Sequence, residues 1–156
     1  MKTKVTMTAA LILTLGTGLT FADGHADSAI QAAIKARQGQ MNINQLNVGA
    51  LFGMAKGDIE YNAEAAQAAA DNLVAMANLN GGAMWPQGSD ASSVEGTRAK
   101  AEIWANFPDV FAKLGTMQET TAALAAVAGD GKEAMQAALG PVGAACNDCH
   151  KEYRSR

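Results

Sequence analysis

The stretch A-A-C-N-D-C-H-K-E-Y-R near the C-terminus holds the side chains of this chain that are best suited to chemistry. Cys146 and Cys149 are the two cysteines of the sequence, and His150 follows directly. In an oxidising compartment, two cysteines form a disulfide by default. A thioredoxin-like redox pair requires a preceding strand, for which the sequence shows no pattern. A zinc site requires about four protein ligands, and beyond these three residues the sequence offers only His25, close to the N-terminus.

The spacing Cys-x-x-Cys-His is also the one through which haem is attached covalently. Residues three and four apart on a helix lie on nearly the same face. Both sulfurs can therefore reach the two vinyl groups along one haem edge, while the imidazole of His150 stands under the iron as a ligand. We expect one covalently attached haem c, bound by Cys146 and Cys149 and ligated by His150.

The N-terminus favours export to an oxidising compartment. Lys2 and Lys4 precede an apolar stretch over residues 5–21, which ends in the small-x-small pattern Thr20-Phe21-Ala22. This is typical of a secretory signal peptide, and the stretch is shorter than the roughly 20 residues of a membrane-spanning helix. We expect residues 1–22 to be a cleaved signal and residues 23–156 to be a periplasmic domain with no membrane span.

Composition narrows the possible partners and the nature of the core. The formal net charge is −3, which does not resemble the basic footprint of a nucleic-acid-binding protein. Aromatic residues make up only 5% of the chain, whereas there are 16 glycines and 8 methionines. The core must therefore come from small and flexible side chains or from a group that is not protein, and a large planar cofactor would fill that shortfall.

Hydrophobic periodicity predicts helices throughout the mature chain. Four long helices are expected over residues 27–56, 63–79, 107–128 and 132–156, with a further helical stretch over 97–104. Asp27 or Ser28 and Asn62 are the expected N-caps, and Pro108 suits a first helical turn. Residues 81–96 are expected to form a long loop. The fold class is therefore all-α, an antiparallel up-and-down four-helix bundle with a covalently bound haem near its C-terminal helix.

Several segments together resemble the class II cytochromes c, the cytochrome c′ group, whose attachment motif lies near the C-terminus of a four-helix bundle. The segments that carry the resemblance are I-K-A-R-Q-G-Q-M, M-A-K-G-D-I-E-Y-N-A, T-R-A-K-A-E-I-W and V-G-A-A-C-N-D-C-H-K-E-Y-R. The resemblance covers essentially the whole mature chain. It implies thioether bonds from both cysteines and a proximal His150.

The resemblance also implies contacts to the haem propionates or rim. Arg37 and Gln38 are expected there from the first helix, and Thr97 or Arg98 from the long loop. For Arg37 the residues give a partly independent argument, because a lone arginine on a face shared with apolar residues is costly unless it meets an anion. The alternatives are an arginine that snorkels at the bundle edge, and a Thr97 that simply caps the next helix.

Met41 decides between two functions. Low-spin members of the resembling family carry a methionine there as a sixth iron ligand, and such a protein would be an electron carrier that docks transiently on redox partners. Other members keep the iron five-coordinate and bind nitric oxide or carbon monoxide, with Met41 then a wall of the pocket. Methionine at helical spacing is also common core filler. We expect an electron carrier and not an enzyme, since Gln40 and Asn44 are the only polar residues nearby. A homodimer through the first two helices is common in that family.

Overall fold

The computed structural model describes residues 22–156, with side chains from Asp27 onward, and this part of the chain consists of helices and connecting loops. Its elements are α1 (Ala22–Lys56), α2 (Ala63–Ala77), the 3-10 helix η1 (Gly82–Met84), α3 (Glu102–Ala105), α4 (Phe107–Ala125) and α5 (Lys132–Tyr153). Among the described residues, no helix is both long and apolar enough to cross a bilayer. The predicted signal peptide lies outside them except for Ala22 and stays a prediction.

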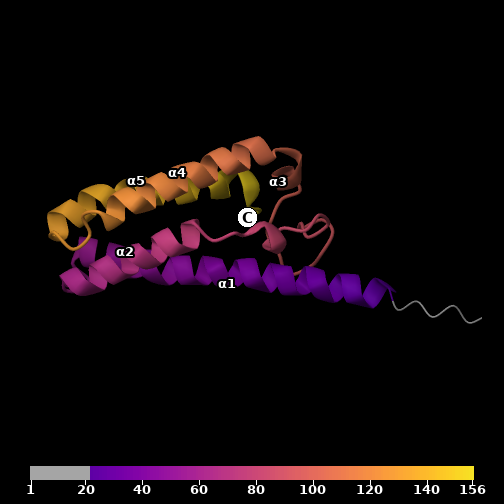
Figure 1. The fold of residues 1–156 in the computed structure, drawn as a ribbon, viewed down its shortest axis with the longest axis horizontal. Helices are drawn as coiled ribbons and strands as arrows, with labels where there is room; N and C mark the ends of the chain where they lie inside the picture. Colours follow the sequence, from indigo (N-terminus) through magenta and orange to yellow (C-terminus); the bar gives the residue numbers. More distant parts are fainter. Residues whose placement is uncertain (1–21) are drawn as a thin grey trace, which may run out of the picture.

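The four long helices form the predicted antiparallel bundle (Figure 1). α1 packs against α2 and α5, while α4 packs against α2 and α5. Short links join α1 to α2 and α4 to α5, which is the arrangement that makes sequential helices antiparallel neighbours. The third connection, between α2 and α4, is long and carries η1 and α3 across one end of the bundle.

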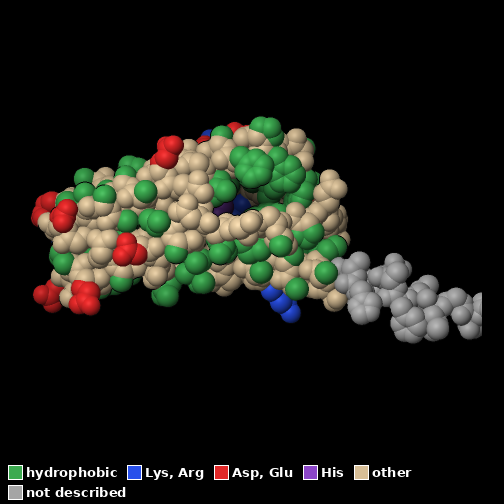
Figure 2. Space-filling view, viewed as in Figure 1, with side chains coloured by type: hydrophobic (Ala, Val, Ile, Leu, Met, Phe, Trp, Pro, Cys, Tyr) green, Lys and Arg blue, Asp and Glu red, His purple; other side chains and the backbone are tan. Residues whose placement is uncertain are grey.

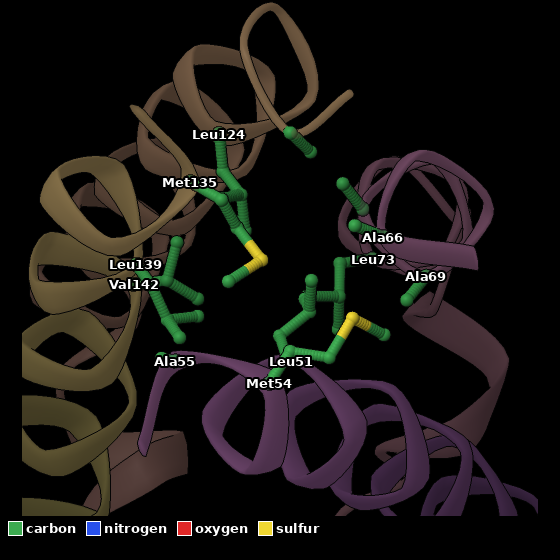
Figure 3. Close-up of a cluster of buried hydrophobic side chains, with 12 residues drawn as sticks. Leu51, Met54, Ala55, Ala66, Ala69, Leu73, Leu124, Met135, Leu139 and Val142 are labelled. Carbon is green, nitrogen blue, oxygen red and sulfur yellow. The ribbon is translucent and has the colours of Figure 1, made fainter. Parts of the chain in front are cut away.

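One core lies between the four long helices at the end away from that connection (Figure 3). Small residues on α2 allow the helices to approach closely, and larger apolar side chains from all four helices, including Leu73 of α2, fill the centre. The main core consists of Leu51, Met54, Ala55, Ala66, Ala69, Ala70, Leu73, Leu124, Ala128, Met135, Leu139 and Val142. A second cluster of Ala99, Ile103 and Tyr153, with Trp85, Trp104, Val110 and Cys149 packed against it, lies at the loop end.

Several predicted helix ends are confirmed by local chemistry. Gly57 ends α1 with a φ of 86°, a backbone conformation that glycine adopts without strain. The side chain of Asn62 caps α2 by accepting from the Ala65 N–H at 2.8 Å. Pro108 lies in the first turn of α4, where its missing N–H costs nothing.

Four helix boundaries differ from prediction. α4 ends at Ala125 and α5 at Tyr153, each three residues before its predicted end. α1 begins at Ala22, before the expected caps Asp27 and Ser28, because no proline interrupts A-D-G-H-A and alanine is the strongest helix former. α2 ends at Ala77, with Asn78 as its C-cap, three residues before the expected stop at Asn80.

The expected helix over residues 97–104 is the main error in the predicted fold. Only its last part is helical, as α3. Ala99 pairs with Arg154 in an isolated antiparallel bridge, and the Lys100 N–H donates to the Tyr153 carbonyl at 3.0 Å. The backbone hydrogen bonds of this segment are thus made with the C-terminus of the chain. Tertiary pairing has overridden a local preference for helix.

Candidate functional site

α5 presents the Cys-x-x-Cys-His motif between the two hydrophobic clusters. Cys146 packs against the main core, with its Sγ 4.0 Å from the Met117 Sδ on α4. Cys149, one turn later, packs against the second cluster. Both cysteines are free and partly buried, so the structure contains no disulfide between them. The motif therefore bridges the seam where the two clusters meet.

The surroundings of the motif favour the uncharged forms of its three side chains. Burial raises the pKa of both thiols, so Cys146 and Cys149 are protonated at neutral pH and behave as apolar groups. His150 is exposed, yet desolvation by the groups around it lowers its pKa, and the positive charge of Arg98 acts in the same direction. A neutral imidazole is the form of histidine that binds a metal.

The inward face of α1 contains one position that the protein does not cover. Ile34, Arg37, Met41, Asn44 and Leu51 follow one another at spacings of three, four and seven, which places them on one side of the helix. Ile34, Arg37 and Leu51 are buried, whereas Met41 is 40% exposed. The Oδ1 of Asn44 is buried and has no hydrogen-bond partner. This face therefore lacks a neighbour around Met41.

α4 shows the same feature on the facing side. Gln118 donates to the carbonyl of Ala77, the last residue of α2, at 3.1 Å. Leu114 and Phe111 lie one and two turns before Gln118 on the same side, beyond the end of α2, and they are 40% and 65% exposed. Phe107 stacks on Phe111 with ring centroids 5.9 Å apart. Leu114 and Phe111 remain this exposed because α2 has ended and does not cover them.

Figure 2 shows a hollow in this part of the surface, with large apolar side chains on its rim and a histidine within it. A planar, largely apolar group with a metal at its centre fits these residues. The exposed side chains of α1 and α4 offer walls for a macrocycle, two thiols lie at one edge, and an imidazole and a thioether could meet the metal. The residues present therefore fit a haem.

The contacts of Arg37 differ from the anionic partner that was expected from its charge. It is only 4% exposed, and its guanidinium donates to the Met84 carbonyl (3.2 Å), to the Ser89 Oγ (2.7 Å) and carbonyl, and to the Thr97 Oγ1 (2.8 Å). It also stacks over the Trp85 ring at 4.7 Å. These contacts satisfy the buried arginine without any propionate, so its burial by itself does not require one. The predicted propionate contact stays a prediction.

The other predicted rim residues are also engaged with the loop. The Gln38 side chain donates to the Gly96 carbonyl at 2.6 Å. Thr97 accepts from Arg37 and does not cap α3, whose N-cap is Ala101. The backbone carbonyl of Arg98 accepts from the Ser155 N–H at 2.9 Å, and the Arg98 side chain is exposed. The structure thus brings Arg37, Gln38 and Thr97 together, and leaves the Arg98 side chain in solvent.

Sequence reasoning missed two residues of this site. Ser89 is fully buried and Trp85 is partly buried beneath Arg37. A serine within G-S-D-A-S-S carries no signal that separates it from an ordinary loop serine. Trp85 had one usable signal, because tryptophan is highly buried on average and this chain has few aromatic residues. Of the polar residues near Met41, Gln40 donates to the Met76 carbonyl and is already engaged.

Comparison with known proteins agrees with this geometry. A sequence model of the family described as Cytochrome C′ matches residues 32–154. Cytochrome c′ of Cereibacter sphaeroides is 36% identical over 148 residues, which are 95% of this chain and 98% of the relative. The solved structure of cytochrome c′ from Rhodobacter Spheriodes superposes with a TM-score of 0.79 at 36% identity, covering 81% of this chain and 98% of that one.

A carbon-monoxide-bound variant of cytochrome c′ from Alcaligenes xylosoxidans has the same fold, with a TM-score of 0.71, 27% identity and coverage of 81% and 97%. Fold, motif and family match thus agree along nearly the whole of the described chain. This chain belongs to the cytochrome c′ family of class II c-type cytochromes, which carry covalently attached haem c.

Proposed function

We propose that this protein is an exported, periplasmic electron carrier. In this proposal Cys146 and Cys149 form the thioethers to haem c, His150 is the proximal ligand, and the Met41 sulfur is the sixth ligand. The observation that carries the proposal is the exposure of Met41 on an otherwise buried helix face. A methionine that served as core filler would be covered by protein, as Met54 and Met135 are.

The haem supplies reversible one-electron chemistry at its iron, and the chain's own residues set the conditions for it. His150 offers a neutral imidazole, because desolvation lowers its pKa. Met41 offers a thioether, a ligand that raises the reduction potential of a haem. The main core and the second cluster keep water from two sides of the seam. Two fixed protein ligands would leave little to rearrange on electron transfer.

The rim residues have a narrower role in this proposal than the family resemblance implies. The four bonds of Arg37 to the loop use its terminal nitrogens, so its Nε–H is the group available to a propionate. The exposed cation of Arg98 is the second candidate, and Gln38 and Thr97 act by holding the loop beside them.

The test is an optical spectrum of the purified holoprotein when oxidised, when reduced, and when reduced under carbon monoxide. The electron-carrier proposal expects sharp low-spin bands that carbon monoxide leaves unchanged, because Met41 occupies the sixth position. Broad high-spin bands that shift under the gas would refute Met41 as a ligand.

A second candidate is a five-coordinate haem that binds nitric oxide or carbon monoxide. It is favoured by the carbon-monoxide-bound relative, which has the same fold. In that case Met41 would line the pocket as an apolar wall. Neither candidate involves catalytic turnover, and under both the redox partners would dock transiently near the hollow.

The proposal includes a homodimer through the first two helices, α1 and α2. Leu46, Ile43 and Ile59 are exposed large apolar residues, and Leu46 and Ile59 line a shallow groove over Gly49. Apolar residues gathered in this way are typical of protein interfaces. Sedimentation velocity on the wild type and on Leu46→Glu tests this, and a wild-type monomer at all concentrations would refute it.

A further inference from the structure

The loop between α2 and α4 forms a tether between the first and the last helix. We use the name tether for residues 85–100. On the α1 side it is bound by Arg37, which reaches the Ser89 Oγ at 2.7 Å in its first part and the Thr97 Oγ1 at 2.8 Å near its other end. Gln38 adds a bond to the Gly96 carbonyl at 2.6 Å. Because Arg37 and Ser89 are both buried, these bonds are shielded from competing water.

The second end of the tether is bound to the C-terminal end of α5. Ala99 pairs with Arg154. The Lys100 N–H donates to the Tyr153 carbonyl at 3.0 Å, and the Ser155 N–H donates to the Arg98 carbonyl at 2.9 Å. The Lys100 Nζ also donates to the Glu152 carbonyl at 2.6 Å. These are mainly backbone bonds, so this end does not depend on any one side chain.

The tether is held in shape by hydrogen bonds within it and by one from Trp104 of α3. A displacement of α1 at one side of the tether is therefore passed on to α5 at the other. The Ser89 Oγ donates to the Pro86 carbonyl at 2.7 Å, and the Trp104 Nε1–H donates to the Trp85 carbonyl at 3.1 Å. The Ala91 N–H donates to the Ala99 carbonyl at 2.8 Å, which closes the loop on itself. Asp90, buried beside Ser89, accepts from the Ser93 hydroxyl at 2.9 Å.

Each anchor lies one helical turn from a proposed iron ligand. Arg37 precedes Met41 by four residues on α1, and Arg154, the C-cap residue of α5, follows His150 by four residues. Farther from the hollow, α1 and α5 are in direct contact, since a Cβ on Gly143, in the middle of α5, would lie 3.3 Å from the Phe52 Cζ. Toward the hollow the ribbons of α1 and of the α4–α5 pair spread apart (Figure 1), and the tether joins them.

We propose that Ser89 is a positioning residue for the sixth iron ligand. By holding Arg37, the buried Ser89 sets the place of α1 relative to α5 at the hollow and so keeps the Met41 sulfur within reach of the iron. The proposal rests on Met41 as a ligand, as proposed above. It assigns to Ser89 and the tether a control over haem coordination that acts through α1 and not through contact with the haem.

The test measures spin state and carbon monoxide binding in holoprotein variants. Ser89→Ala removes the hydroxyl that accepts from Arg37, and Arg37→Lys keeps the charge but loses the planar fork that reaches several acceptors. In both, we expect the reduced protein to bind carbon monoxide with an affinity at least about tenfold higher than the wild type. The loss of one hydrogen bond to a charged group weakens the closed arrangement of α1 by at least about tenfold, and carbon monoxide competes with Met41 for the iron by the same factor.

The control variant is Gln136→Ala. It removes a direct side-chain hydrogen bond between α5 and α1, from the Gln136 Nε2 to the Ala55 carbonyl at 2.6 Å, at the far end of the bundle. Urea unfolding of all variants shows how much stability each has lost. We expect Gln136→Ala to lose stability but to keep the wild-type spectrum and its low affinity for the gas.

The outcomes separate this proposal from the function it rests on. A wild type that is already high-spin and binds the gas refutes Met41 as a ligand, and with it the role of Ser89. A low-spin wild type with unchanged spectra in Ser89→Ala and Arg37→Lys overturns the Ser89 proposal alone. Equal release of Met41 in Gln136→Ala would also overturn it, because the effect would then be general loosening. If Ser89→Ala does not hold haem, Arg37→Lys decides.

Discussion

Replacement of Met41 by leucine separates the packing of this side chain from its chemistry. Full burial of a methionine side chain contributes about 1.5–3 kcal/mol. With 40% of Met41 exposed, its packing contributes about 1–2 kcal/mol, scaled by the buried fraction. Leucine has a similar volume, so the packing part of the loss in unfolding free energy for Met41→Leu is expected to be less than about 1.5 kcal/mol. The haem coordination should nevertheless change completely.

The assay combines urea unfolding, followed by far-UV circular dichroism, with optical spectra in the presence and absence of carbon monoxide. The expected result is a stable, fully folded Met41→Leu protein with high-spin bands that shift under the gas. Met54→Leu is the matched control, because Met54 is buried in the main core and its substitution should leave the spectrum unchanged. A low-spin Met41→Leu protein, insensitive to the gas, would refute the assignment of the sulfur as a ligand.

Three further predictions concern stability. Leu73→Ala, in the centre of the main core, should lower the unfolding free energy by about 2–5 kcal/mol in urea while the haem spectrum is retained. The Ser92 hydroxyl, together with Ser93 and backbone N–H groups, lowers the pKa of Asp90 from 3.8 to about 2. The stability that this shift contributes is present above pH 3.8 and is lost as pH falls through 2. Urea titrations across this range should show the loss in the wild type and no such loss in Asp90→Asn. The Asp109 carboxylate, which accepts from the Tyr153 hydroxyl at 2.6 Å, raises the Tyr153 pKa from 10.0 to about 12. The stability that this shift contributes is present below pH 10 and is lost as pH rises through 12. Urea titrations over this range should show the loss in the wild type, and Tyr153→Phe should abolish it.

The helices were predictable because their signals are local. A cap such as Asn62, a left-handed glycine such as Gly57 and a first-turn proline such as Pro108 each act within one or two turns of the backbone. The segment T-R-A-K was not predictable in this way. Its backbone pairs with residues more than fifty positions later, and no local pattern reports such a partner.

In the candidate site, too, local features were predictable from the sequence and long-range features were not. The spacing of Cys146, Cys149 and His150 specifies its own geometry, because a helix places positions three and four apart on one face. The exposure of Met41, Leu114 and Phe111 could not be read from the sequence. It arises because α2 ends at Ala77 and leaves the facing surfaces of α1 and α4 without a neighbour.

The sequence by itself thus determined the helices and the attachment motif, since each depends on periodicity or spacing along a single helix. The family followed from the resemblance of several segments. Only the tertiary structure decided what Arg37 binds, because the loop that supplies Ser89 and Thr97 lies about fifty to sixty residues away in the chain. The charge of Arg37 indicated that it needed acceptors, but the long-range folding of the loop determined which acceptors it found.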